Sequence, residues 1–262
     1  MAEGRGVIEH IEIEGFKSLE RVSLDLGPLN IFVGTNASGK TNFLEALRVL
    51  QGIGYGYTID EIFNGRPKIG NNQAWEGIRG GSTYSGFLRT PGAGPEGSLV
   101  QFRVRISMAS IREPVHYSIS IFTIDSSLHS ESLAVGDRVI YNVTPFEYRA
   151  EGADELLPGE SDSSDVAIDR SRPFLGQVWN SPWSTPSEFG EIVKSIRGCL
   201  GDAQVLNPLP NVQRQYSTAA AAVRMGDHGE DFAGVIDSIL RDTLGLSPWL
   251  RQTNKRLCTG RW

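Results

Sequence analysis

The sequence has little cysteine, little histidine and no long apolar run, and each shortage narrows the classes of protein that it can be. Its 262 residues include two cysteines and four histidines. Cys199 and Cys258 lack metal-ligand spacing, so we expect unpaired thiols in a reducing compartment. No apolar run approaches a membrane span, and the first residues lack the apolar core of a secretory signal. We therefore expect a cytoplasmic protein with no membrane partner.

Basic residues are also in the minority. Lysine and arginine total 25 against 31 aspartates and glutamates, a net charge of −6. This balance argues against a uniformly basic surface for nucleic acid, although a local basic patch remains compatible with it. Arg103 and Arg105, on the polar face of an expected strand, are candidates for contacts with DNA phosphates, and a solvated strand face is the alternative.

What the sequence does contain is one strong motif, G-x-x-x-x-G-K-T at residues 34–41. The apolar, β-favouring residues 31–33 precede it and predict a strand. Apolar residues at helical spacing follow it and predict a helix with Glu45 and Arg48 on its solvent face; they are Phe43, Leu44, Leu47 and Leu50. A loop between a strand and a helix is the context in which this motif binds phosphate.

The residue types of this loop suit a triphosphate. Backbone N–H groups at the start of a helix converge on an anion, and Gly34 and Gly39 let the backbone approach it closely. Lys40 would place a positive charge on the β- and γ-phosphates, and the Thr41 hydroxyl would coordinate Mg²⁺. The predicted nucleotide-binding residues of the loop are Gly34, Thr35, Asn36, Ala37, Ser38, Gly39, Lys40, Thr41 and Asn42.

The rest of the chain predicts a mixed α/β protein. Alternation indicates two antiparallel strands before the loop, with Ile11 and Ile13 on the inner face, and a β meander between residues 100 and 143 that ends in two shorter strands, at 133–135 and 139–143. Residues 52–98 are expected to be irregular apart from a turn of helix near 59–63, and the acidic residues 151–169 a mobile loop.

Two further helices are expected in the last third of the chain. Thr185 as N-cap and Glu188 are expected to form a capping box, with Pro186 at the first helical position, before a stripe of apolar residues at 189, 192, 193 and 196. The second helix spans residues 231–244. We expect one partial domain over residues 1–262, with parts at 1–52 (hairpin, loop strand and helix), 53–150 (irregular segment and meander), 151–183 (acidic loop) and 184–262 (helices).

Two segments together resemble a known family: Ile13-Glu-Gly-Phe-Lys-Ser-Leu in the hairpin and residues 30–42 around the loop. They are similar, over residues 8–52, to the N-terminal part of the ABC-type ATPase heads of SMC, RecF and OLD-like proteins and of related prokaryotic AAA family ATPases. The resemblance implies an α/β P-loop NTPase head with an antiparallel β-meander lobe and a few helices. It also implies ATP between two heads, hence a homodimer or larger head-to-head assembly.

Further implications of the resemblance concern the hairpin and the biological role. Lys17 and Ser18 would lie near the nucleotide; the alternative for Lys17 is a solvated turn lysine. The protein would act in DNA maintenance or anti-phage defence, with DNA or a DNA-processing protein as a partner.

The sequence departs from this family where hydrolysis is concerned. A Walker B strand should end in Asp-Glu, but the nearest candidate, residues 119–125, alternates like a meander strand and is followed by Ser126. The signature loop is also missing, because Arg79-Gly-Gly-Ser82 comes too early and precedes no expected helix. We therefore expect a head that is incomplete before Walker B, whose catalytic residues are unknown.

These features lead to one main functional hypothesis and two alternatives. The main hypothesis is a protein that binds Mg-ATP and whose hydrolysis needs further sequence or a partner. The first alternative is a nucleotide-gated interaction module without turnover. The second is a P-loop kinase, for which residues 52–98 supply only Arg66, Arg79 and Arg89 as lid arginines.

Overall fold

The computed structural model describes nearly two thirds of the chain in detail. The described residues are 6–27, 29–35, 37–68, 74–87, 99–145, 148–150, 168–179, 188–206, 210–213, 226 and 229–235. By its contacts the chain divides into two units, Met1–Ala203 and Gln204–Trp262. The second unit contains the short helix α6 (Pro210–Gln213) and helical residues at 232–235, within the helix expected at 231–244. A single domain over residues 1–262 stays a prediction.

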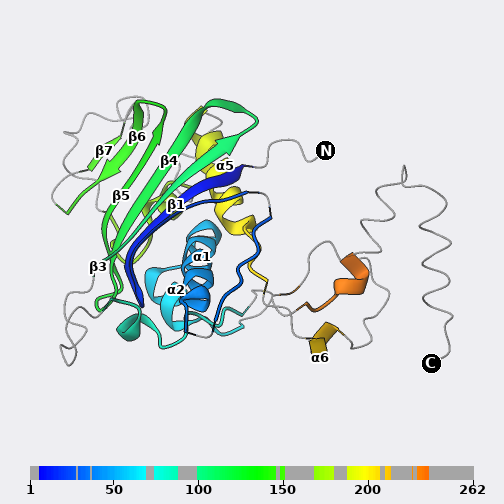
Figure 1. Ribbon diagram of the computed structural model, residues 1–262. Helices are drawn as coiled ribbons and strands as arrows, with labels where there is room; N and C mark the ends of the chain where they lie inside the picture. The colour runs from blue at the N-terminus through cyan, green and yellow to red at the C-terminus, as the bar shows by residue number, and fades with distance from the viewer. Residues whose placement is uncertain are drawn as a thin grey trace, which may run out of the picture. The chain divides into compact units, whose positions relative to one another are not determined.

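The first unit is built on one seven-stranded antiparallel sheet (Figure 1) in the order β2-β1-β3-β4-β5-β6-β7. Its strands are β1 (Val7–Phe16), β2 (Leu19–Asp25), β3 (Leu99–Met108), β4 (Ile111–Phe122), β5 (Ser127–Val135), β6 (Arg138–Val143) and β7 (Tyr148–Ala150). The expected hairpin and meander are both confirmed. Strand β1 of the hairpin pairs with strand β3 of the meander. The hairpin and the meander therefore share one sheet although they are distant in sequence.

One face of this sheet carries the core because the strands alternate as expected. On β1, Ile11 and Ile13 are fully buried, and on β3 Val100, Phe102 and Ile106 are too. Helices bury this face: α1 (Lys40–Tyr55), α2 (Ile59–Asn64), α4 (Phe174–Trp179) and α5 (Glu188–Asp202). Helix α1 contacts β1, α2, α4 and α5 (Figure 1). The mixed α/β fold is therefore the one expected for an incomplete P-loop ATPase head.

Helix α1 confirms the expected helix after the loop. Gly39 and Gly56, both left-handed with φ of 88° and 77°, flank its two ends, a conformation that glycine adopts without a steric cost. Its inner face is buried over Phe43, Ala46, Val49, Leu50 and Ile53. The expected solvent position of Glu45 is wrong, because its carboxylate is shielded in an ion pair with the hairpin.

The expected strand at residues 31–33 is also wrong. These residues lie outside the described sheet. Leu29, Ile31 and Val33 are 79%, 78% and 86% exposed, whereas the Phe32 ring packs on Phe43 with centroids 4.8 Å apart. A strand needs a hydrogen-bonded neighbour, and the described residues supply none here. The segment thus keeps the apolar alternation of a strand without its pairing.

Other expectations have mixed outcomes. The turn of helix near 59–63 is confirmed as α2, with a capping box between Thr58 and Glu61. The expectation of a short strand at 133–135 is wrong, since β5 has nine residues and begins at Ser127. Thr185, Pro186 and most of the acidic residues 151–169 lie outside the described residues, and α5 is described from Glu188.

The core contains one ionisable group that the sequence patterns did not reveal. Glu131 of β5 is 1% exposed and accepts hydrogen bonds from the hydroxyls of Tyr117 and Tyr141 and from the backbone N–H groups of Phe174 and Leu175. These contacts tie α4 to the sheet. Burial raises the pKa of Glu131 to about 7, although the four hydrogen bonds oppose the shift.

This pKa makes stability depend on pH. The folded chain binds the Glu131 proton more tightly than the unfolded chain, whose ordinary value is 4.5. As the pH rises from about 4.5 to about 7, the contribution of this residue to the free energy of unfolding should therefore fall by on the order of 3 kcal/mol. Urea unfolding of Glu131→Gln, which cannot ionise, should lack that part of the decline. The exposed Glu113→Gln control should retain it, and equal pH dependence in all three proteins would contradict the assignment.

Candidate functional site

The candidate site is the junction between the 34–41 loop and α1. Gly34, Thr35, Ala37 and Ser38 are exposed, and the helix begins at Lys40. Ala37 and Gly39 both have positive φ, at 65° and 88°, which turns the backbone sharply before the helix. Asn36, the remaining residue of the loop, lies outside the described residues.

The Lys40 ammonium group lies among the polar atoms of the loop. Its Nζ donates to the carbonyl oxygens of Gly34 at 2.8 Å and Thr35 at 2.6 Å, and to Ser38 Oγ at 3.1 Å. The loop therefore folds around its own lysine. A bound anion would compete with these three acceptors for the same donors.

The first turn of α1 favours an anion. It contains no acidic residue, so nothing in that turn offsets the partial positive charge of the helix N-terminus. Thr41, the predicted Mg²⁺ ligand, is exposed at the second helical position. The sequence motif and the helix end thus coincide in space.

The hairpin tip lies against this junction. Ser18 Oγ accepts a hydrogen bond of 2.6 Å from Nδ2 of Asn42, the residue in the first turn of α1 that directly follows the loop. A Cβ atom placed on Gly39 would lie 3.6 Å from Ser18 Oγ. The fold therefore brings together Ser18, Gly39 and Asn42, which the family resemblance had placed near one nucleotide.

Lys17, at the same tip, is not the solvated turn lysine of the alternative interpretation. It adopts a φ of 50°, its side chain is 8% exposed, and its Nζ pairs with Glu45 of α1 and donates to the carbonyl oxygen of Arg79 at 2.7 Å. Burial lowers the pKa of Lys17, and the Glu45 carboxylate opposes that shift. A contact of Lys17 with nucleotide stays a prediction.

Arg79 also lies in this region, through contacts that the sequence patterns did not predict. Its Nε lies 3.8 Å from Glu45 Oε1 and its guanidinium 3.5 Å from Asn42 Oδ1, while the side chain is 72% exposed. The sequence marks Arg79 only as a lid arginine for the kinase alternative and as the start of Arg79-Gly-Gly-Ser82, which comes too early for a signature loop and precedes no expected helix. That expectation needs correction, because the three-residue 3-10 helix η1 (Ser82–Tyr84) follows. Only the folded chain shows that Arg79 reaches α1.

Other candidate residues lie elsewhere. Residues 119–122 lie in β4, between β3 and β5, and Asp125 is exposed in the turn that follows, so this segment belongs to the meander. Arg103 and Arg105 pair with Glu12 at 3.0 Å and Glu9 at 3.6 Å, which reduces their charge for DNA. The described residues contain no group of three acidic, histidine or cysteine side chains placed for a metal ion.

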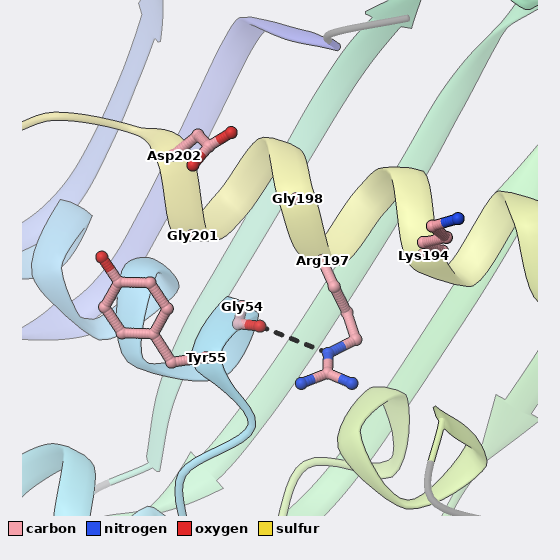
Figure 2. A pocket seen from close by; sticks show the side chains of 7 residues that line it. All are labelled: Gly54, Tyr55, Lys194, Arg197, Gly198, Gly201 and Asp202. Carbon is pink, nitrogen blue, oxygen red and sulfur yellow. Dashed lines mark hydrogen bonds between the residues drawn. The ribbon is translucent and has the colours of Figure 1, made fainter. Parts of the chain in front are cut away.

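A separate pocket of about 280 Å³ lies at the other end of α1, where it meets α5 (Figure 2). Arg197 donates from Nε to the Gly54 carbonyl oxygen at 3.2 Å, a cation at a helix C-terminus. Sixteen residues of helix rise roughly 24 Å, so this pocket is remote from the loop. It is lined by Gly54, Tyr55, Lys194, Arg197, Gly198, Gly201 and Asp202.

The loop, hairpin and helix resemble the N-terminal part of a P-loop head of the ABC ATPase type. Residues 7–58 match the family model described as AAA ATPase domain. The match covers the hairpin, the loop and α1. This N-terminal region is therefore similar in sequence to an SMC- and RecF-like ATPase head.

Similarity to individual proteins is confined to a short segment. DNA replication and repair protein RecF of Lactobacillus acidophilus is 43% identical over 44 residues, and the RecF proteins of Lactococcus lactis and Streptococcus agalactiae are 50% and 48% identical over the same length. That segment is 16% of this chain and only 12% of each relative. No solved structure matches the chain. None of the helices in the described part is long and apolar enough to span a membrane.

The contact between α1 and α5 that orients the site can be tested with two glycines. A Cβ on Gly54 would lie 2.3 Å from the Gly201 backbone nitrogen, whereas one on Gly198 would meet nothing within 4 Å. Gly54→Ala should lower the free energy of unfolding by about 1–3 kcal/mol through overpacking. Gly198→Ala should raise it by about 0.5–1 kcal/mol, because alanine is the better helix former. Urea unfolding measures both, and two changes of the same sign would contradict the close helix contact.

Proposed function

We propose that this chain binds Mg-ATP through a Walker A loop at residues 34–41, with Asn42, Lys17 and Ser18 beside it. The observation that carries the proposal is the Lys40 ammonium group, held by three acceptors in the loop at the N-terminus of a helix whose first turn lacks acids. Backbone N–H donors, a positive helix end and a point charge are what a triphosphate needs.

The residues at the helix start fit a magnesium ion carried by the nucleotide. Thr41 is exposed and would supply one hydroxyl ligand, and phosphate oxygens would supply others. The ion would neutralise phosphate charge. Because the described residues show no Asp-Glu pair after an apolar strand beside the loop, we propose that hydrolysis depends on further sequence or on a partner.

The biological setting is proposed from the relatives. Those relatives are DNA replication and repair proteins, and the matched family is a family of ATPases. We propose a role in DNA maintenance or in defence against foreign DNA, in a homodimer or larger head-to-head assembly in the cytoplasm, with DNA or a DNA-processing protein as partner. The kinase alternative gains nothing, since Arg66 is engaged by Glu61 and Tyr57.

The binding proposal predicts a lysine-dependent affinity for nucleotide. Calorimetric titration of the full chain with Mg-ATP should show saturable binding, and Lys40→Ala should weaken it at least about tenfold, because a charge-assisted contact to phosphate is lost. Lys68→Ala, which removes an exposed lysine, is the matched control and should bind like the unsubstituted chain. Absence of binding to the intact chain would refute the proposal.

A nucleotide-gated interaction module without turnover is the second candidate, and the exposed apolar row supports it. Leu29, Ile31 and Val33 lead directly into the loop, so anything bound at the loop lies next to this row. If the row joins two copies, the mass in solution should rise on adding Mg-ATP, and Ile31→Lys should prevent the rise. Light scattering measures this, and a mass that ATP leaves unchanged would argue against the module.

A further inference from the structure

We infer that Glu45 is a positioning residue for the nucleotide site and that Lys17 acts through Glu45 rather than on the phosphates. This inference rests on the proposed binding of Mg-ATP to the 34–41 loop. The sequence pattern assigned Glu45 to the solvent face of α1. The structure places it instead at the meeting point of three segments that are distant in sequence.

The first line of evidence is the convergence of contacts on one carboxylate. Glu45 pairs with Lys17 of the hairpin through Oε2 and lies 3.8 Å from Arg79 Nε through Oε1. Lys17 also donates to the Arg79 carbonyl oxygen at 2.7 Å, which closes a triangle. Glu45 thus connects the hairpin tip and the backbone and side chain of Arg79 to α1, the helix that follows the loop.

The second line of evidence is burial. The Lys17 and Glu45 side chains are only 8% and 13% exposed, so water screens their attraction little and their relative position is well defined. The Lys17 donors are directed to Glu45 and to a backbone carbonyl within this cluster. The Lys17 ammonium group is therefore engaged within the cluster of Lys17, Glu45 and Arg79, and the exposed cation of this cluster is Arg79.

The third line of evidence is charge. Glu45 follows Lys40 by five residues, so its carboxylate lies within about two turns of the predicted phosphate site. An unpaired carboxylate there would repel a triphosphate, and the shielded environment would strengthen the repulsion. Lys17 removes this repulsion by neutralising Glu45. The hairpin lysine can thus support phosphate binding without touching a phosphate.

The two roles of Lys17 make opposite predictions in a double-mutant cycle. Affinity for Mg-ATP is measured by calorimetry for the intact full chain and for Lys17→Met, Glu45→Gln and the double variant. If Lys17 acts through Glu45, Lys17→Met should weaken binding about tenfold in the intact background and less than about twofold in the Glu45→Gln background. If Lys17 contacts a phosphate directly, the loss should be equal in both backgrounds, which would overturn the inference.

Further variants separate positioning from folding. Lys17→Arg should retain affinity, because a guanidinium also pairs with Glu45. Arg103→Met removes a cation from an exposed ion pair with Glu12 and should leave affinity unchanged. Should Lys17→Met fail to fold, Lys17→Gln replaces it, and urea unfolding confirms that each variant is folded at the titration temperature.

The outcomes also separate this inference from the function on which it rests. No binding of Mg-ATP to the intact chain refutes the proposed function. Binding that Lys40→Ala abolishes, together with equal effects of Lys17→Met in both backgrounds, refutes only the role of Glu45. If Lys40→Ala abolishes binding and Lys17→Met weakens it only in the chain that retains Glu45, both the proposed function and the role of Glu45 are supported.

Discussion

The burial of α1 is the constraint on which the site depends. Its inner face, which includes Phe43, Leu50 and Ile53, is buried in the core shared with the sheet, and Gly54 lets α5 approach its last turn closely. With the helix held along its length, its N-terminus has a defined direction, and the 34–41 loop turns into it through Gly39. The loop therefore presents its donors from a rigid element although its own residues are largely exposed.

Electrostatics at the site follow from the same arrangement. The hairpin of β1 and β2 brings Ser18 and Lys17 to the first turns of α1, where Lys17 meets Glu45 and Ser18 meets Asn42. An unpaired carboxylate so close to the predicted phosphate site would oppose anion binding, but Glu45 is paired with Lys17 and shielded from water. Glu131 in the core is a contrasting case. Its carboxylate has neutral hydrogen-bond donors instead of a cation as partners, and burial raises its pKa in spite of them.

Local patterns predicted the elements whose burial repeats regularly. The alternation of β1 and β3 and the stripe of α1 follow directly from apolar periodicity, and the motif at residues 34–41 marked the start of the helix. Prediction failed where polar residues face the core or apolar residues face outward. The first half of β5 is polar and includes the buried Glu131, so its strand was underestimated. Residues 31–33 have a strand's composition but lack a neighbour to pair with.

The sequence by itself determined the glycine-rich motif at residues 34–41, the helix after it and the hairpin before it, because glycine placement, a Lys-Thr pair and apolar period are local properties. Only the tertiary structure decided the surroundings of that loop. The contacts of Glu45 with Lys17 and Arg79 join residues that are 28 and 34 positions apart in the sequence. The hydrogen bond from the backbone N–H of Phe174 in α4 to the Glu131 carboxylate joins residues 43 positions apart. Such contacts depend on how sheet and helices pack together, and no local pattern records that.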